Sequence, residues 1–194
     1  MRVGSVLRGV LFVGAHPDDE TIMAGGTLAM LAARGIPTHV ICVTDGRGGE
    51  AGGVPEAEDP AQRAEVRARE LACAATALGV RTLIAFGYED PLIGPDDALY
   101  GFAAEEGTLA RQIADAVRAI APPVDVILTH GTDGEYGHPA HRQVHQAARR
   151  AVRELLPDVL LYTTSALIPG QDDRLWNKSD PAHLALTDAL RRRR

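Results

Sequence analysis

The stretch VLFVGAHPDDE, residues 10–20, decides the fold that this chain is expected to adopt. Its first six residues are apolar or small, which is typical of a short strand buried on both faces of a sheet. HPDDE then forms a polar turn, and residues 21–34 have the spacing of a helix that ends before Gly35. A buried strand that leads through a turn into a helix is the opening of a β-α-β unit.

The same alternation continues along the chain. Further short apolar runs lie at residues 38–43, 82–86, 124–129 and 159–164. Segments of helical period lie between them, at residues 61–78, 109–121 and 139–156. Strands that are apolar on both faces and joined by helices form parallel sheets with right-handed crossovers. We therefore predict an α/β fold, a three-layer Rossmann-like sandwich with a mostly parallel sheet and strand order 3-2-1-4-5, as a single domain over residues 1–194.

Composition and charge exclude several classes of partner. The chain is 45% hydrophobic and 24% charged with a net charge of -6, so nucleic acid is not an expected partner. The four arginines at 191–194 are interpreted as a solvated chain end. The apolar run at 10–15 is too short for a signal peptide or a membrane span, so we expect a cytoplasmic protein. Cys42 and Cys73 are expected to be buried free thiols, and a homo-oligomer stays open as an alternative to a monomer.

Two polar clusters follow the first and the fourth predicted strands. They are HPDDE at 16–20 and YGHPAH at 136–141. In the predicted strand order these strands are neighbours where the winding reverses, and ligands bind beyond the C-terminal strand ends at such a point. The clusters are therefore expected to meet in one crevice. Two glycine-rich loops, 45–53 and 87–107, leave the same edge of the sheet and are expected to wall it.

Three side chains of these clusters suit a catalytic zinc ion. His16 and Asp19 lie three apart on the turn, and His141 comes from the second cluster. Two imidazoles and one carboxylate leave a fourth position for water, whose pKa falls to about 7 on zinc. His145 lies on the same helical face as His141, which makes a His141/His145 pair an alternative, but we favour a place for His145 one turn away. His130, at the end of the fourth strand, could lie near the site.

Other polar residues of the clusters are candidates for proton transfer. Asp18 lies beside a ligand on an extended turn and is the candidate general base. His138 faces the same side as His141 and could protonate a leaving amine or hold the oxyanion. Tyr136 could donate a second hydrogen bond to that oxygen. Glu20 has a simpler interpretation as a helix-capping carboxylate.

Each of these motifs alone is weak evidence. Acidic residues at a helix N-terminus commonly only cap it, and a His-x-x-His spacing does not by itself indicate a metal. Capping does not require histidines in both clusters, however, and both fall at the predicted switch point, which favours a metal site. No G-x-G-x-x-G follows the first strand, so a dinucleotide-binding enzyme ranks last.

Four blocks of the chain resemble the LmbE-like, or PIG-L, zinc-dependent N-acetylglucosaminyl de-N-acetylases. The blocks are HPDDE with GGTLA (16–20 and 25–29), TDG with GE and G (44–46, 49–50 and 52), R with EL and LGV (67, 70–71 and 78–80), and YGHP with H (136–139 and 141). The resemblance covers residues 10–165. It implies an N-deacetylase that acts on a small amino-sugar conjugate.

The resemblance also implies a role for each site residue. The metal, Zn²⁺ or another divalent transition metal such as Fe²⁺, is implied on His16, Asp19 and His141; the general base is Asp18; the groups at the reacting carbonyl are His138 and Tyr136; and the sugar contacts are Arg67 and Asp90. The last two have simpler alternatives. Arg67 could be an ordinary helical arginine, and Asp90 a turn residue before Pro91.

Two features depart from the family pattern. Ala140 stands where the family commonly has an aspartate, which removes one carboxylate from the surroundings of His138. The segment from Ser179 to Arg194 resembles the start of a tail that in many relatives continues into a further helix, and here the sequence stops early. These departures are the basis of the alternative function, a non-catalytic or weakly active sugar- or metal-binding member of the same fold.

Overall fold

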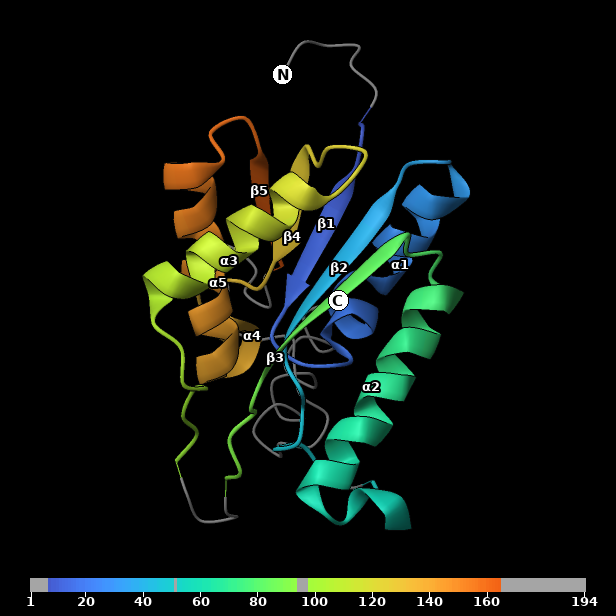
Figure 1. The fold of residues 1–194 in the computed structure, drawn as a ribbon, viewed down its shortest axis with the longest axis vertical. Helices are drawn as coiled ribbons and strands as arrows, with labels where there is room; N and C mark the ends of the chain where they lie inside the picture. The colour runs from blue at the N-terminus through green and yellow to red at the C-terminus, as the bar shows by residue number, and fades with distance from the viewer. Residues whose placement is uncertain (1–6, 51, 94–97, 165–194) are drawn as a thin grey trace, which may run out of the picture.

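The computed structural model describes residues 7–50, 52–93 and 98–164, in which five parallel strands form one sheet (Figure 1). The strands are β1 (Val10–Gly14), β2 (Thr38–Thr44), β3 (Thr82–Tyr88), β4 (Val126–Thr129) and β5 (Leu160–Thr163). Their order is β3-β2-β1-β4-β5, and every neighbouring pair is parallel. The predicted α/β class and strand order are confirmed.

Helices cover both faces of the sheet (Figure 1). α1 (Asp19–Ala33) and α2 (Pro60–Ala77) lie on one face, and α3 (Glu106–Ala119) and α5 (Pro139–Leu155) lie on the other. Every residue of β1 and β2 is buried, because apolar side chains leave these strands toward both helical layers. Among the described residues, no helix is long and apolar enough to cross a membrane.

Two apolar clusters hold the layers together. The larger one packs α3 and α5 against the sheet and contains Leu11, Ile113 and Val144, each fully buried. The smaller one packs α1 against the other face through Phe12 and Leu28. Helices therefore pack against both faces of the sheet. The polar groups lie at the carboxyl ends of its central strands.

Some details differ from the sequence-based expectation. α1 begins at Asp19, two residues earlier than predicted, because Asp19 and Glu20 already form its first turn. The short helices η1 (Pro55–Ala57) and α4 (Gly134–Gly137) are not predicted, since three or four residues carry no period. The expectation that both cysteines are buried is wrong for Cys73, which is exposed on α2, and right for Cys42.

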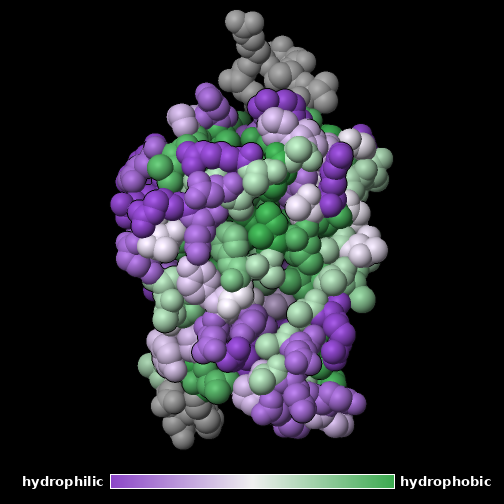
Figure 2. Space-filling view, viewed as in Figure 1, coloured by the Kyte–Doolittle hydropathy of each residue, from purple (hydrophilic) through white to green (hydrophobic). Residues whose placement is uncertain are grey.

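β3 is an edge strand and is more exposed than the central strands. Its residues are half-buried or exposed. Apolar side chains gather over this part of the molecule on the face drawn in Figure 2. The functional groups lie elsewhere, at the carboxyl ends of β1 and β4.

Candidate active site

The turn after β1 places two adjacent carboxylates in different surroundings. Its shape is fixed by Asp19, whose Oδ2 accepts a hydrogen bond of 2.7 Å from His16 N. Asp18 has a φ of 117°, a conformation that costs free energy for any residue except glycine. As a result Asp19 is 3% exposed, whereas the side chain of Asp18 is 51% exposed.

The segment between β4 and α5 brings three histidines to the same edge of the sheet. His130 directly follows β4, and its Nε2 accepts a hydrogen bond of 3.0 Å from Ala15 N at the end of β1. His138 caps α5, because its Nδ1 accepts a hydrogen bond of 3.3 Å from Ala140 N. His141 lies in the first turn of α5 and is 1% exposed. The two polar clusters therefore meet in one place.

The three predicted ligand side chains form a compact triangle. His16 Nδ1 lies 3.3 Å from His141 Nε2 and 3.6 Å from Asp19 Oδ2, and His141 Nε2 lies 3.4 Å from Asp19 Oδ1. Tetrahedral ligands at the usual zinc distances of about 2.0–2.1 Å are about 3.3–3.4 Å apart. The donor types therefore fit a divalent transition metal such as zinc, and the two contacts of Asp19 are made by its two different oxygens.

Two further histidines lie close to these three side chains. Among the described residues, the groups whose ligand atoms lie within 4.8 Å of one another are His16, His138 and His141, and Asp19, His130 and His141. His141 belongs to both groups, whereas His16 and Asp19 fall in different ones. The sequence predicts His141 as a ligand, and the structure places four other side chains of metal-ligating types near it.

Neighbouring groups of opposite charge stabilise the charged forms of His16 and Asp19. Burial disfavours the charge on His16, but hydrogen bonds to Asp19 and Asp90 outweigh it and raise its pKa to about 10. Burial likewise opposes the charge on Asp19, yet His130 and His141 hold its pKa well below the usual value. A buried carboxylate that stays ionised among imidazole nitrogens is a donor set suited to a divalent transition metal.

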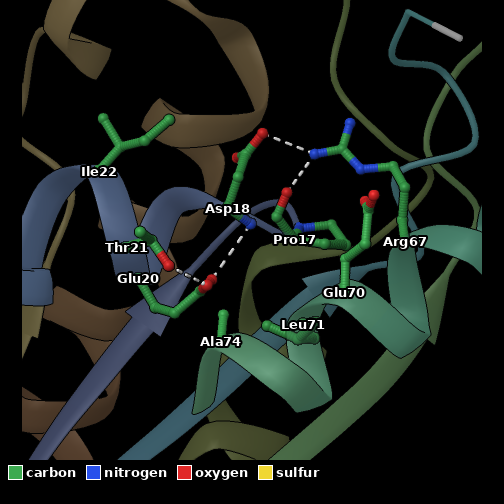
Figure 3. A pocket seen from close by; sticks show the side chains of 9 residues that line it. All are labelled: Pro17, Asp18, Glu20, Thr21, Ile22, Arg67, Glu70, Leu71 and Ala74. Atoms are coloured by element: carbon green, nitrogen blue, oxygen red, sulfur yellow. Dashed lines mark hydrogen bonds and ion pairs between the residues drawn. The ribbon is translucent and has the colours of Figure 1, made fainter. Parts of the chain in front are cut away.

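Asp18 is paired with Arg67 from α2 (Figure 3). Arg67 Nη2 donates a hydrogen bond of 2.6 Å to Asp18 Oδ2 and also donates to the carbonyl oxygen of Pro17. Burial and the charge of Asp19 raise the pKa of Asp18 to about 6, although Arg67 opposes them. A cavity of about 210 Å³ opens beside this pair, lined by α1 and α2 side chains that include Ile22.

Asp90 lies on the other side of the triangle. Its Oδ1 is 3.3 Å from His16 Nε2, and the residue is 9% exposed. A second cavity, of about 560 Å³, adjoins it and is lined by both glycine-rich loops, with Arg47 and Tyr100 on its walls. The prediction that these loops wall the crevice agrees with this arrangement.

The remaining candidates lie as follows. Tyr136 belongs to α4, but its side chain is outside the described part of the structure. His145 Nδ1 donates a hydrogen bond of 2.8 Å to the carbonyl oxygen of His130, and His145 is in neither ligand group found among the described residues.

Ala140 is fully buried in the larger apolar cluster. Burial lowers the pKa of His138 to about 3, with the neighbouring charges of His16 and His141 adding to the effect.

Glu135 is a buried carboxylate that sequence reasoning missed. It is 2% exposed, and its Oε2 is 2.8 Å from His141 Nδ1. Burial opposes its charge, but hydrogen bonds from His130 and His141 lower its pKa below the usual range. Its place directly before the YGHP block, between β4 and α5, is the one signal in the sequence that could have pointed to it.

The fold is a doubly wound parallel α/β sheet, and two histidines and a carboxylate, residue types that ligate metals, lie at its switch point. The chain belongs to the PIG-L family, described as GlcNAc-PI de-N-acetylase, which it matches over residues 11–152. The resemblance carried by the four sequence blocks is confirmed.

The chain is similar in sequence to curated deacetylases and in fold to several solved structures. The 1D-myo-inositol 2-acetamido-2-deoxy-alpha-D-glucopyranoside deacetylase 1 of Catenulispora acidiphila is 42% identical over 78% of this chain and 50% of its own length. The solved N,N'-diacetylchitobiose deacetylase of Pyrococcus horikoshii has a TM-score of 0.60 at 23% identity, over 76% of this chain and 50% of that one. GalB of Pseudomonas putida KT2440, a 4-carboxy-2-hydroxymuconate hydratase, has a TM-score of 0.59 at 29% identity, over 75% and 55%. The chain spans about half the length of the curated relatives it matches.

Proposed function

We propose that this chain is a metal-dependent amide hydrolase that removes the N-acetyl group from an N-acetylglucosamine-type substrate. The observation that carries the proposal is the cluster of His16, Asp19 and His141. His16 Nδ1 and His141 Nε2 are 3.3 Å apart, and they lie 3.6 Å from Oδ2 and 3.4 Å from Oδ1 of Asp19, respectively. Family membership and the names of the curated relatives, which are deacetylases of an acetamido sugar, support the substrate class.

We propose Zn²⁺ as the metal, held by His16, Asp19 and His141. Two imidazoles and one carboxylate are a common catalytic zinc set, and Fe²⁺ accepts the same ligands. A divalent cation held there supplies Lewis acidity, which lowers the pKa of water and polarises a carbonyl oxygen. Side chains of the protein are proposed to carry out proton transfer and to stabilise the transition state.

Asp18 is proposed as the general base. It lies on the same turn as two ligands, and its half-exposed carboxylate is accessible to water. The carboxylate accepts the proton of the attacking water and can return it to the leaving amine. The hydrogen bond from Arg67 holds one of its oxygens, Oδ2, which leaves the other for this transfer.

His138 is proposed as the group that stabilises the transition state. Its ring centroid lies 4.8 Å from that of His16 and 4.6 Å from that of His141, on the border of the triangle. An imidazole N–H at this position can donate a hydrogen bond to the carbonyl oxygen as negative charge develops on it. Tyr136, two residues earlier, stays a proposed second donor on the strength of its sequence position.

We propose that the amino sugar and its attached group occupy the cavity beside Asp90. Its volume of about 560 Å³ falls in the range of about 300–1,000 Å³ usual for small-molecule sites. The carboxylate of Asp90 can accept a hydrogen bond from a sugar hydroxyl. Arg67 is proposed to act on the substrate through Asp18, since Nη2 is already engaged by that carboxylate.

The proposal is tested by stripping the purified chain of metal and adding Zn²⁺, Co²⁺ or Fe²⁺. Release of acetate is then measured from an inositol-linked N-acetylglucosamine, from N,N'-diacetylchitobiose and from free N-acetylglucosamine. We expect release from at least one substrate, abolished by chelation and restored by metal. A zinc-loaded chain that releases no acetate from any of them would contradict the proposal.

A hydratase is the second candidate, because the solved hydratase GalB is 29% identical to this chain. Addition of water to a carbon–carbon double bond needs an activated water and a base, as amide hydrolysis does. The same metal-loaded samples are therefore assayed with 4-carboxy-2-hydroxymuconate. Loss of its ultraviolet absorbance without any acetate release from the sugars would favour the hydratase.

A further inference from the structure

Glu135 connects two histidines at the base of the site. Its Oε2 lies 2.8 Å from His141 Nδ1 and 3.1 Å from His130 Nδ1. Its Oε1 accepts hydrogen bonds of 2.8 Å from Gly131 N and 2.7 Å from Thr164 Oγ1. Both oxygens of one buried carboxylate are thus satisfied by four donors from the β4–α5 segment and the end of β5.

The backbone of Glu135 is strained to make this arrangement. Its φ is 58°, in the left-handed region, and the preceding Gly134 has a φ of 64°. A non-glycine residue keeps such a conformation only where the surrounding structure compensates for its cost. The four hydrogen bonds to the carboxylate supply that compensation, because the left-handed turn is what directs the side chain inward.

The direction of the hydrogen bonds fixes the tautomer of His141. An ionised carboxylate has acceptors only, so the ring nitrogens that face Glu135 must donate. His141 therefore carries its proton on Nδ1, and its Nε2 presents a lone pair to His16 and Asp19, 3.3 and 3.4 Å away. An unprotonated ring nitrogen is the form of histidine that binds a metal.

His130 lies between Glu135 and Asp19. Its Nε2 lies 3.2 Å from Asp19 Oδ2, and its ring stacks on His141 with centroids 3.9 Å apart. Asp19, His130, Glu135 and His141 thus form a closed ring of polar contacts, because His141 Nε2 returns to Asp19 Oδ1. Two of its four members are the proposed ligands, and one comes from each polar cluster.

We propose that Glu135 is the positioning residue of the metal site, which orients the proposed ligand His141 through the hydrogen bond at Nδ1. The inference rests on the proposed function, since it presupposes a metal on His141 and Asp19. Glu135 touches neither substrate nor reacting atoms. Its removal leaves all three proposed ligands in the chain but no longer fixes the orientation of His141, and loss of such a partner typically weakens metal binding by about 10–100-fold.

The test compares Glu135→Gln with wild type and with the matched control Thr164→Val. Glutamine keeps the shape but replaces one acceptor by an NH₂ that confronts a ring N–H, whereas Thr164→Val removes a donor to the oxygen that no histidine contacts. Zinc affinity is measured by competition with a chromophoric chelator, and the melting temperature is measured with and without zinc. We expect Glu135→Gln to lose about 10–100-fold in affinity and most of the zinc-induced rise in melting temperature, and Thr164→Val to stay within about threefold of wild type.

A purely structural role of Glu135 predicts a different result. The variant would then melt lower with and without zinc by the same amount, and its zinc affinity would equal that of wild type; this result would overturn the inference. If Glu135→Gln does not fold, Glu135→Asp takes its place, and wild-type affinity there would overturn the inference in the same way. Failure of the wild type itself to bind zinc would instead remove the proposed function, and the inference with it.

Discussion

Arg67 Nη2 donates a hydrogen bond of 2.6 Å to Asp18 Oδ2 across 49 positions of sequence. The pair joins the start of α1 to α2, and a second hydrogen bond from Arg67 to the Pro17 carbonyl holds the turn between β1 and α1 (Figure 3). Asp18 needs this support because its φ of 117° is unfavourable for a non-glycine residue. The structure therefore connects Arg67 with the proposed base, where the sequence resemblance implies a sugar contact.

This connection predicts how Arg67→Gln changes the kinetics. Without the guanidinium the carboxylate of Asp18 is no longer held in place, so we expect kcat to fall by about 10–100-fold with little change in KM. The control is Arg69→Gln, which removes an exposed arginine from the same helix and should leave both constants unchanged. A rise in KM at constant kcat would instead identify Arg67 as a substrate contact.

Asp18→Asn separates the base from the ligands. Asparagine cannot accept the proton of water, so we expect a loss of about 10²–10⁴-fold in kcat with the metal content unchanged. Asp115→Asn is the matched control, because Asp115 is also a carboxylate paired with an arginine, Arg118 at 2.9 Å, but on the exposed side of α3. Full activity of Asp18→Asn would remove Asp18 from the mechanism.

Gly46, in the TDG block at residues 44–46, packs against the turn that contains Pro17 and Asp18. Gly46 has a φ of 69°, and a Cβ atom built on it would lie 2.8 Å from Pro17 Cδ and 3.0 Å from Arg67 Nε. Gly46→Ala should therefore destabilise the fold by about 1–2 kcal/mol or more in urea unfolding. Gly26→Ala is the control, because Gly26 lies within α1 with open space around it, and there alanine should stabilise the helix by about 0.5–1 kcal/mol. Equal effects at both positions would contradict this account.

Because the imidazole of His39 is buried, we expect the stability of the fold to depend on pH. It is fully buried in β2, and neither ring nitrogen has a hydrogen-bond partner among the described residues. Burial lowers its pKa, with the charge of Arg81 contributing. As the pH falls below the unfolded value of about 6.5, the unfolded chain takes up the proton before the folded chain does, so stability is lost toward lower pH.

The variant His39→Leu should lose this contribution. Relative to wild type, its free energy of unfolding should rise as the pH is lowered from 7 to 5, by up to about 1.4 kcal/mol per pH unit. Urea unfolding of both proteins at each pH measures the difference, in which the other titrating groups cancel. A difference that stays constant over this range would show that His39 does not titrate differently in the two states.

Much of the fold is predictable from the sequence because its signals are local. β1 and β2 are apolar on both faces, and the helices end at glycine or proline, so the alternation and the strand order follow. The same topology predicts that the clusters at 16–20 and 136–141 meet. The structure brings His16, Asp19 and His141 together, and their roles stay predictions.

The parts that the sequence does not predict depend on backbone geometry and on distant contacts. Glu135 points inward only because its φ is 58°, and no pattern in the sequence encodes that angle for a glutamate. The pair of Arg67 and Asp18 depends on how α2 packs beside α1, which periodicity leaves open. Glu135 contacts the predicted ligand His141, and Arg67 contacts the predicted base Asp18. These contacts can be identified only when the predicted residues have been placed in three dimensions.

The central claim is that one divalent cation is held by residues of both polar clusters. It is tested most directly by the zinc content of three variants after dialysis, with metal quantified per chain by mass spectrometry. We predict about one zinc in wild type and in His145→Ala, whose ring is bonded to the His130 carbonyl, and none in His16→Ala or His141→Ala. Full zinc occupancy in either of the last two variants would contradict the assignment of the site.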